Sequence, residues 1–316
     1  MLTRYRAWAA TIVAGLALLA GLAMSLSGCS TSFAFGLGDP GGRIFAVGAE
    51  SEYANVIQQV GGNYVKVSAI LSNPNTDPHT FEASAAVGRL LNQAQLVVQN
   101  GAGYDRFMNT IEGAVPNSSR KLIVVQDLFG LPDSTPNPHL WYRPGTMSAV
   151  ANAIAVGLAA IQPAHAAYFK TRAAAFDRSL QTWTNAVAQF RASYQGTPVA
   201  TTEPVADYLL QALGARNLTP WAFQADIMNG TDPSPQDVAA ERNLLTQHRV
   251  KVLVYNQQVT DSLTESFVTA AKANGIPVVG VYETMPEPGY DYQSWMLAEV
   301  QALRSAVANH TSTEHL

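Results

Sequence analysis

Cysteine is nearly absent from this 316-residue chain, which contains only Cys29. A single cysteine cannot form an intrachain disulfide, and any metal site elsewhere in the chain needs ligands other than thiolates. Charged residues are also scarce, at 13% against 47% apolar residues, and no basic tract occurs. This composition is typical of a globular chain and argues against a nucleic-acid-binding protein.

The N-terminus carries the features of a targeting segment. Two arginines precede a mostly apolar run over residues 7–24, which leads into Leu26-Ser27-Gly28-Cys29. Small residues directly before a cysteine resemble a bacterial lipobox, in which cleavage precedes Cys29 and the cysteine is then acylated. The alternative is an uncleaved anchor, for which the apolar run is at the short end. We predict a signal peptide over 1–28 and a lipid-anchored tether over 29–42. This places the protein at the extracytoplasmic face of the cell membrane.

Beyond the tether, short apolar strands alternate with helix-forming segments, which predicts an α/β fold with mainly parallel sheets. Residues 146–196 consist almost entirely of helix-forming residues, and Pro163 divides them. The second part predicts a rigid helix over about 164–194, which would span about 45 Å and join two lobes. The expected divisions are an N-terminal lobe over 43–145, the helical region over 146–196, a C-terminal lobe over 197–310 and a tail over 311–316.

Histidine is also scarce, with six in the chain. Two of them occur in matched contexts, Pro78-His79 and Pro138-His139, each after a strand-like run and a polar loop. Ligands of α/β lobes are presented beyond the carboxyl ends of strands, and imidazole is the commonest metal-ligating side chain. The pair therefore indicates two metal ligands on the N-terminal lobe.

Two glutamates occupy similar positions in the second half of the chain. Glu203 follows the predicted strand 198–201, and Glu283 follows the predicted strand 277–282. Two imidazoles and two carboxylates form a ligand set that suits Mn²⁺, Fe²⁺ or Zn²⁺. We expect the four side chains to converge in the cleft between the lobes, a common place for a ligand site.

The segments Asp77-Pro78-His79-Thr80-Phe81-Glu82 and Pro138-His139-Leu140-Trp141 resemble motifs of a known family. These are the metal-binding solute-binding proteins of zinc and manganese ABC importers, and the resemblance spans about residues 44–308. It implies two α/β lobes joined by one long helix, with metal ligands at His79, His139, Glu203 and Glu283. Asp291 is the alternative ligand if Glu283 does not bind the metal. The resemblance also implies a monomer that hands its cargo metal to an ABC permease and has no enzymatic activity.

The chain departs from the family pattern at three places. Arg143 stands where the family often has an acidic residue, and residues 126–137 lack the histidines of many zinc-specific members. Glu283 replaces the usual Asp.

Two carboxylates favour Mn²⁺ or Fe²⁺, whereas intrinsic affinity at a nitrogen and oxygen site favours Zn²⁺ over Mn²⁺. The sequence leaves the choice of metal open.

Two other functions fit parts of the pattern. A metal-dependent hydrolase needs an open coordination position with a general base beside it, and no His-Glu-x-x-His helix occurs in the chain. If the protein is instead a surface adhesin with a structural metal, adhesion should survive removal of the metal-ligating side chains. A receptor instead predicts loss of metal uptake.

Overall fold

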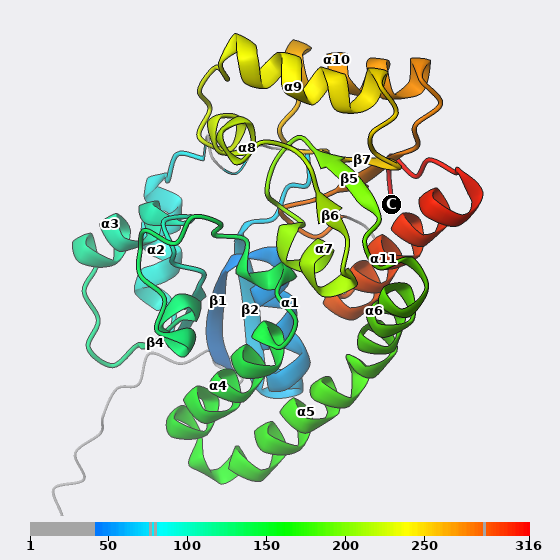
Figure 1. Ribbon diagram of the computed structural model, residues 1–316. Coiled ribbons are helices and arrows are strands. Elements are labelled where there is room, and N and C mark those ends of the chain that lie inside the picture. Colours follow the sequence, from blue (N-terminus) through cyan, green and yellow to red (C-terminus); the bar gives the residue numbers. More distant parts are fainter. Residues whose placement is uncertain (1–41, 76–77, 79–80, 287–288) are drawn as a thin grey trace, which may run out of the picture. The chain divides into compact units, whose positions relative to one another are not determined.

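Two four-stranded parallel sheets, one in each half of the chain, organise the structure (Figure 1). The computed structural model describes residues 42–75, 78, 81–286 and 289–316. The predicted signal peptide, Cys29 and His79 lie outside the described residues. No helix in the described part of the chain combines the length and the apolar character needed to cross a membrane.

The N-terminal sheet has the strand order β2-β1-β3-β4, with all neighbours parallel. Its strands are β1 (Ile44–Glu50), β2 (Val65–Leu71), β3 (Leu96–Gln99) and β4 (Lys121–Val124). The helices of this lobe are α1 (Ser51–Gly61), α2 (Ala85–Gln93) and α3 (Arg106–Ala114), with short helices η1 (Gly62–Tyr64), η3 (Val125–Phe129) and η4 (Leu140–Tyr142). Nearly every residue of β1 and β3 is buried, as expected for strands covered on both faces.

The C-terminal sheet repeats this arrangement with the order β6-β5-β7-β8. Its strands are β5 (Pro198–Thr201), β6 (Arg216–Asn217), β7 (Val252–Asn256) and β8 (Val278–Val281). The helices are α7 (Asp207–Leu213), α8 (Trp221–Met228), α9 (Pro235–Thr246), α10 (Ser262–Ala273) and α11 (Tyr292–Asn309). The prediction of two α/β lobes with mainly parallel sheets is thereby confirmed.

Three helices connect the lobes: α4 (Thr146–Ile161), α5 (Ala166–Ser179) and α6 (Gln181–Tyr194), with the short η5 (Pro163–His165) between the first two. The helix predicted over 164–194 is therefore two helices that meet at Leu180. The Ser179 hydroxyl donates to the Phe176 carbonyl at 2.6 Å, and such a bond competes with regular helical pairing. Leu180 retains helical backbone angles, so the path of the chain is nearly continuous.

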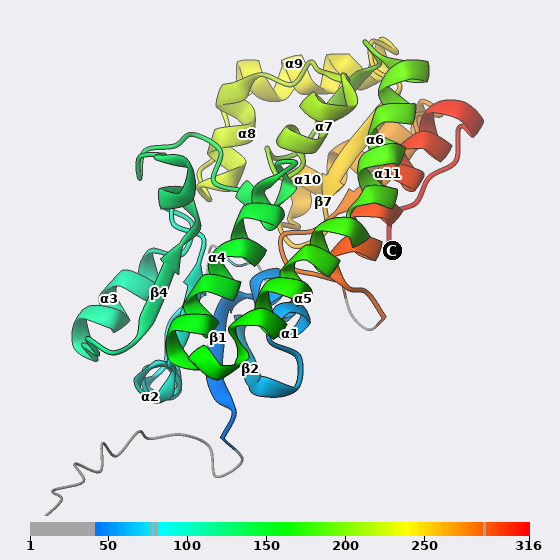
Figure 2. The same cartoon turned by 90° about the horizontal axis from the view of Figure 1, so that it is seen from below.

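The break at Leu180 coincides with a change of packing partner. Helix α5 packs on α4 and α1 of the N-terminal lobe, whereas α6 packs on α11 and α7 of the C-terminal lobe (Figure 2). Leu180 itself is buried. The connection thus passes from one lobe to the other with Leu180 packed inward and its neighbours Ser179 and Gln181 exposed.

The last residues of the chain extend the C-terminal sheet. Thr313 pairs in parallel with Val279 of β8, and its backbone N–H donates to the Val278 carbonyl at 2.9 Å. Gly280 allows this close approach, because a Cβ added there would collide with the backbone carbonyl oxygen of Glu314. The predicted tail over 311–316 is therefore attached along β8.

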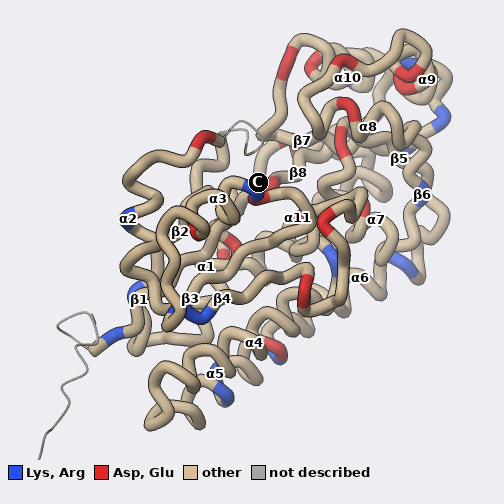
Figure 3. The backbone as a smooth tube through the Cα atoms, turned by 90° about the vertical axis from the view of Figure 1, so that its left-hand side faces the viewer, with Lys and Arg blue, Asp and Glu red and all other residues tan. Residues whose placement is uncertain are grey.

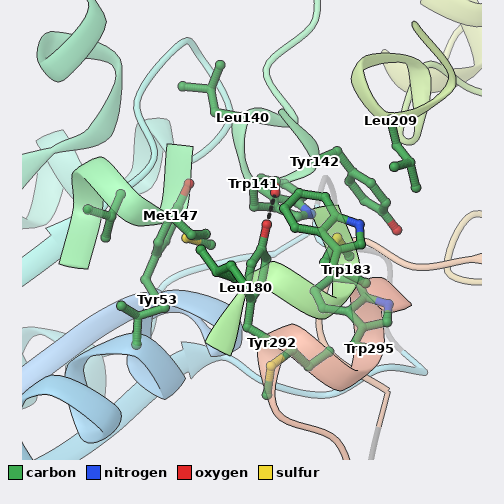
Figure 4. Packing of buried hydrophobic residues seen from close by; sticks show 14 of the residues in the cluster. Tyr53, Leu140, Trp141, Tyr142, Met147, Leu180, Trp183, Leu209, Tyr292 and Trp295 are labelled. Carbon is green, nitrogen blue, oxygen red and sulfur yellow. Dashed lines mark hydrogen bonds between the residues drawn. The ribbon is translucent and has the colours of Figure 1, made fainter. Parts of the chain in front are cut away.

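One hydrophobic core includes side chains from both lobes. It contains Ile44 and Val98 from the N-terminal sheet, Val199 and Val281 from the C-terminal sheet, and Leu180 from the helical connection. Figure 4 shows its aromatic centre, where rings from the two halves pack together. Apolar packing among these side chains therefore joins the two sheets.

Charged positions of both signs are scattered along the chain (Figure 3).

Candidate metal centre

His139 lies in the segment 137–142, which follows β4 and η3, and its side chain is fully buried. The Asn137 Oδ1 atom accepts the His139 backbone N–H at 3.0 Å and lies 2.8 Å from His139 Nδ1. Since this atom accepts a backbone N–H, it is the amide oxygen, and Nδ1 must carry the proton. The Nε2 atom then carries the lone pair, which is the tautomer that a metal ligand requires.

Two carboxylates come together at the edge of the C-terminal sheet. Glu203 follows β5 and Glu283 follows β8, each two residues beyond the end of its strand. The carboxyl ends of parallel strands meet at one edge of a sheet, and β7 alone separates β5 from β8. Both glutamates are buried, at 3% and 0% exposure. This strand order explains how residues 80 positions apart in sequence become neighbours.

Asn256, the last residue of β7, lies between the two carboxylates. Its Nδ2 atom donates to Glu203 Oε2 at 2.8 Å and to Glu283 Oε1 at 2.7 Å. Asn256 is fully buried. Asn256 was not among the predicted site residues. A signal for it was present, because it is the polar residue that ends the otherwise apolar strand β7, while Glu203 and Glu283 follow the ends of β5 and β8.

The imidazole of one lobe meets a carboxylate of the other. His139 Nε2 lies 3.6 Å from Glu283 Oε2, and both side chains are fully buried. The Tyr104 hydroxyl donates to the same oxygen at 2.8 Å. Burial raises the pKa of Tyr104 well above its ordinary value, and the charge of Glu283 raises it further. Tyr104 therefore remains a proton donor toward Glu283 at physiological pH.

The segment 137–142 touches both carboxylate-bearing loops. Asn137 Nδ2 donates at 2.7 Å to the carbonyl of Pro204, the residue after Glu203. At the other end, the Tyr142 hydroxyl donates at 2.9 Å to the carbonyl of Tyr282, the residue before Glu283. Between them, the Tyr292 hydroxyl donates to the Trp141 carbonyl at 2.6 Å, the dashed line in Figure 4. One N-terminal segment thus fixes His139 against both C-terminal loops.

Asn100, the residue directly after β3, forms a hydrogen bond with the segment 137–142. Its Nδ2 atom donates to the carbonyl of Pro138 at 2.8 Å, and its Oδ1 accepts the Tyr53 hydroxyl at 2.6 Å. Asp105 accepts the Asn100 backbone N–H at 2.6 Å. Asn100 therefore contacts the peptide that directly precedes His139.

Further carboxyl groups lie behind the site. Glu50 and Glu52, at the end of β1 and the start of α1, are fully buried. Burial, then the neighbouring Asp105, raises the pKa of Glu50 well above its usual range. Burial raises the pKa of Glu52 to about 8, and the charge of Glu283 contributes to the rise. Both groups are therefore largely protonated at pH 7 and add little negative charge behind Glu283.

Asp291, the fallback ligand, has another role in the structure. It is the N-cap of α11, and its Oδ1 accepts the Ser294 backbone N–H at 2.8 Å, while the Ser294 hydroxyl accepts the Asp291 backbone N–H at 3.0 Å. Reciprocal bonding of this kind is a capping box. Asp291 is exposed, in contrast to the buried Glu283.

His79 lies outside the described residues, but two residues beside it are described. Pro78 and Phe81 line a cavity of about 160 Å³ together with Thr284, the residue after Glu283. Within the described parts of the chain, no three His, Cys, Asp or Glu side chains are grouped closely enough to hold a metal ion. The described donors are the pair His139 and Glu283, with Glu203 joined to Glu283 through Asn256.

The chemistry of these donors fits a divalent transition metal. A neutral imidazole with a fixed lone pair and two buried carboxylates supply borderline-to-hard nitrogen and oxygen ligands. Burial of carboxylates is costly without compensating charge or hydrogen bonds, and a bound cation supplies that charge. The donor types therefore suit a divalent cation, and His139 and Glu283 come from different lobes.

Comparison with known proteins agrees with the fold. Residues 47–306 match the family model described as "Zinc-uptake complex component A periplasmic". The chain is 21% identical to the manganese-binding lipoprotein MntA of Bacillus subtilis, over 79% of this chain and 82% of that protein. Its fold resembles the periplasmic zinc-binding protein TroA of Treponema pallidum, with a TM-score of 0.70 at 18% identity over 84% and 99% of the two chains. It also resembles FpvC of Pseudomonas aeruginosa, solved with Mn²⁺, with a TM-score of 0.69 at 19% identity over 85% and 99% of the chains.

Proposed function

Because the chain belongs to the family of the periplasmic component A of zinc-uptake complexes, we propose that it captures a divalent transition metal between its lobes. It then delivers the metal to the permease of an ABC importer. This family consists of transport receptors rather than enzymes. The observation that carries the proposal is the 3.6 Å distance between His139 Nε2 of one lobe and Glu283 Oε2 of the other, with both side chains buried.

We propose His79, His139, Glu203 and Glu283 as the ligands. His139 has its tautomer fixed by Asn137, and the two glutamates lie at the ends of strands that flank β7. For His79 the support is the cavity that Pro78 and Phe81 share with Thr284. The cargo is Mn²⁺, Zn²⁺ or Fe²⁺, three metals that suit this ligand set. Manganese and zinc also stand in the names of the related proteins.

We further propose that acylation of Cys29 holds the receptor at the membrane, as a monomer, on the extracytoplasmic side. The support is the lipobox-like Leu26-Ser27-Gly28-Cys29 and the description of the related MntA as a lipoprotein. Replacing Cys29 with Ala should abolish incorporation of a labelled fatty acid without changing the metal affinity of residues 30–316.

The central test is metal binding by residues 30–316 prepared under chelation. Added Zn²⁺ or Mn²⁺ should raise the melting temperature, because a ligand that binds only the folded state stabilises it. His139→Ala and Glu283→Ala should each lower the affinity by at least about a hundredfold, corresponding to about 2.7 kcal/mol. His248→Ala and Glu265→Ala, on the surface of the C-terminal lobe, serve as controls. Melting temperatures that are independent of every metal would contradict the proposal.

A further inference from the structure

Asn256 is placed to control how the two glutamates bind a metal. An amide NH₂ group has two hydrogens, and here Nδ2 lies within 2.8 Å of one oxygen of each carboxylate. The two oxygens concerned are Glu203 Oε2 and Glu283 Oε1. One oxygen on each glutamate is therefore engaged by the same amide.

The orientation of the Asn256 amide is fixed by its other contacts. Its Oδ1 atom accepts the Gln258 backbone N–H at 3.0 Å, so the amide cannot be turned over without losing that bond. Its own backbone N–H donates to the Thr202 hydroxyl at 3.1 Å. Asn256 is also buried at the end of a central strand. The NH₂ group must face the carboxylates.

The second oxygen of Glu283 faces the imidazole. Glu283 Oε2 is the atom that lies 3.6 Å from His139 Nε2 and accepts the Tyr104 hydroxyl. The two oxygens of this carboxylate thus have different neighbours. Oε1 lies beside the hydrogens of an amide whose orientation is fixed. Oε2 lies beside the Nε2 atom of His139 and a hydroxyl group, whose hydrogen can rotate away from an incoming cation.

We propose that Asn256 is a specificity-determining residue that holds Glu203 and Glu283 in one-oxygen coordination. Chelation by both oxygens would bring the cation against the NH₂ hydrogens of Asn256, which repel it, and would compete with two charge-assisted hydrogen bonds. Each glutamate therefore offers one oxygen. One-oxygen coordination keeps the number of ligands low, as in the tetrahedral sites of Zn²⁺, and disfavours Mn²⁺, which prefers octahedral oxygen sites. This inference rests on the proposed function and narrows it to a zinc-selective site.

The test uses Co²⁺ as a probe, because tetrahedral Co²⁺ absorbs visible light far more strongly than octahedral Co²⁺. The wild-type protein should give the intense tetrahedral spectrum. Asn256→Ala removes one hydrogen bond from each carboxylate and should give a weaker spectrum, together with a fall of at least about tenfold in the ratio of Zn²⁺ to Mn²⁺ affinity. Asn256→Ser retains one donor and should lie between them.

Asn217→Ala is the matched control. Asn217 Nδ2 also donates to two side-chain oxygens of the same lobe, Thr201 Oγ1 at 3.1 Å and Asp207 Oδ1 at 2.9 Å. Its loss should lower stability while leaving the Co²⁺ spectrum and the affinity ratio unchanged.

The outcomes separate this inference from the proposed function. A wild-type protein that binds none of the metals Co²⁺, Zn²⁺ and Mn²⁺ contradicts the proposed function. A wild-type protein that binds them with an octahedral Co²⁺ spectrum, or an Asn256→Ala variant that keeps the wild-type spectrum and ratio, overturns the role of Asn256 alone. If circular dichroism shows that both Asn256 variants fail to fold, the wild-type spectrum still decides between four and six ligands.

Discussion

At the scale of single residues, the asparagine two positions before His139 determines how that histidine can act. Asn137 fixes the proton on Nδ1 and anchors the loop to the Pro204 carbonyl. Removing a hydrogen-bond partner of a metal-ligating histidine typically costs tenfold to a hundredfold in metal affinity. We expect a loss of that size in Asn137→Ala, measured by competition against a zinc chelator.

Asn117 provides the control for this prediction. Its Oδ1 accepts the backbone N–H of Ser119 at 3.1 Å, the same turn geometry that Asn137 makes with His139, but at an exposed position. Asn117→Ala should leave metal affinity unchanged. Equal losses in the two variants would show that the turn alone, and not the tautomer of His139, matters.

The sequence predicted His139, Glu203 and Glu283 as site residues because ligand-type side chains after strands are visible in a linear pattern. It could not predict Asn256 or Asn137 in the same way. Their roles depend on which atoms face which neighbours, and Asn256 lies between the glutamates only because β7 lies between β5 and β8. A linear pattern contains the ends of strands, but not the order of strands in a sheet.

At the scale of elements, the close pairing of the chain end with β8 depends on Gly280. An added Cβ would collide with the Glu314 backbone, so Gly280→Ala should displace residues 311–316. The loss of the Val278 and Thr313 hydrogen bonds should lower the free energy of unfolding by about 1–3 kcal/mol. Urea denaturation measures this change.

The control for Gly280 is Gly113 in α3, where an added Cβ meets no neighbouring atom. Gly113→Ala should raise stability by about 0.5–1 kcal/mol, because alanine favours the helical state. Destabilisation of similar size in both variants would refute the steric explanation.

The predicted strands and most helices follow from period and turn residues, since those signals are local. The break at Leu180 is different. Residues 164–194 have continuous helical periodicity, and the interruption arises from the Ser179 bond to Phe176 and from a change of packing partner. The Ser179 bond is local, but the change of packing partner is tertiary and leaves no signal in the sequence.

At the scale of the whole molecule, buried carboxyl groups should make stability depend on pH. Burial raises the pKa values of Glu52, Glu241 and Glu299 to about 8, so the folded state retains protons that the unfolded state releases above about pH 4.5. The stabilisation is complete below the unfolded pKa and is lost as pH rises through the folded pKa. The free energy of unfolding of the metal-free protein should therefore fall between about pH 4.5 and 8, by up to about 1.4 kcal/mol per pH unit for each group.

Denaturant titrations at several pH values measure this slope. Glu241, on α9, is fully buried. Glu241→Gln cannot ionise and should reduce the slope while raising stability at pH 7. A free energy of unfolding that rises through this window would show that these carboxyl groups are ionised in the folded protein.

The common hydrophobic core has a consequence for the modularity of the protein. Leu180 marks the passage between lobes, yet it is buried among side chains from both of them. Cutting the chain at this residue would therefore divide one shared hydrophobic core, and would not separate two independently folded domains. Each half would expose apolar surface that only the other half covers, at a cost of about 25 cal/mol for every Å². The two sheets repeat one architecture, but neither is an independent module.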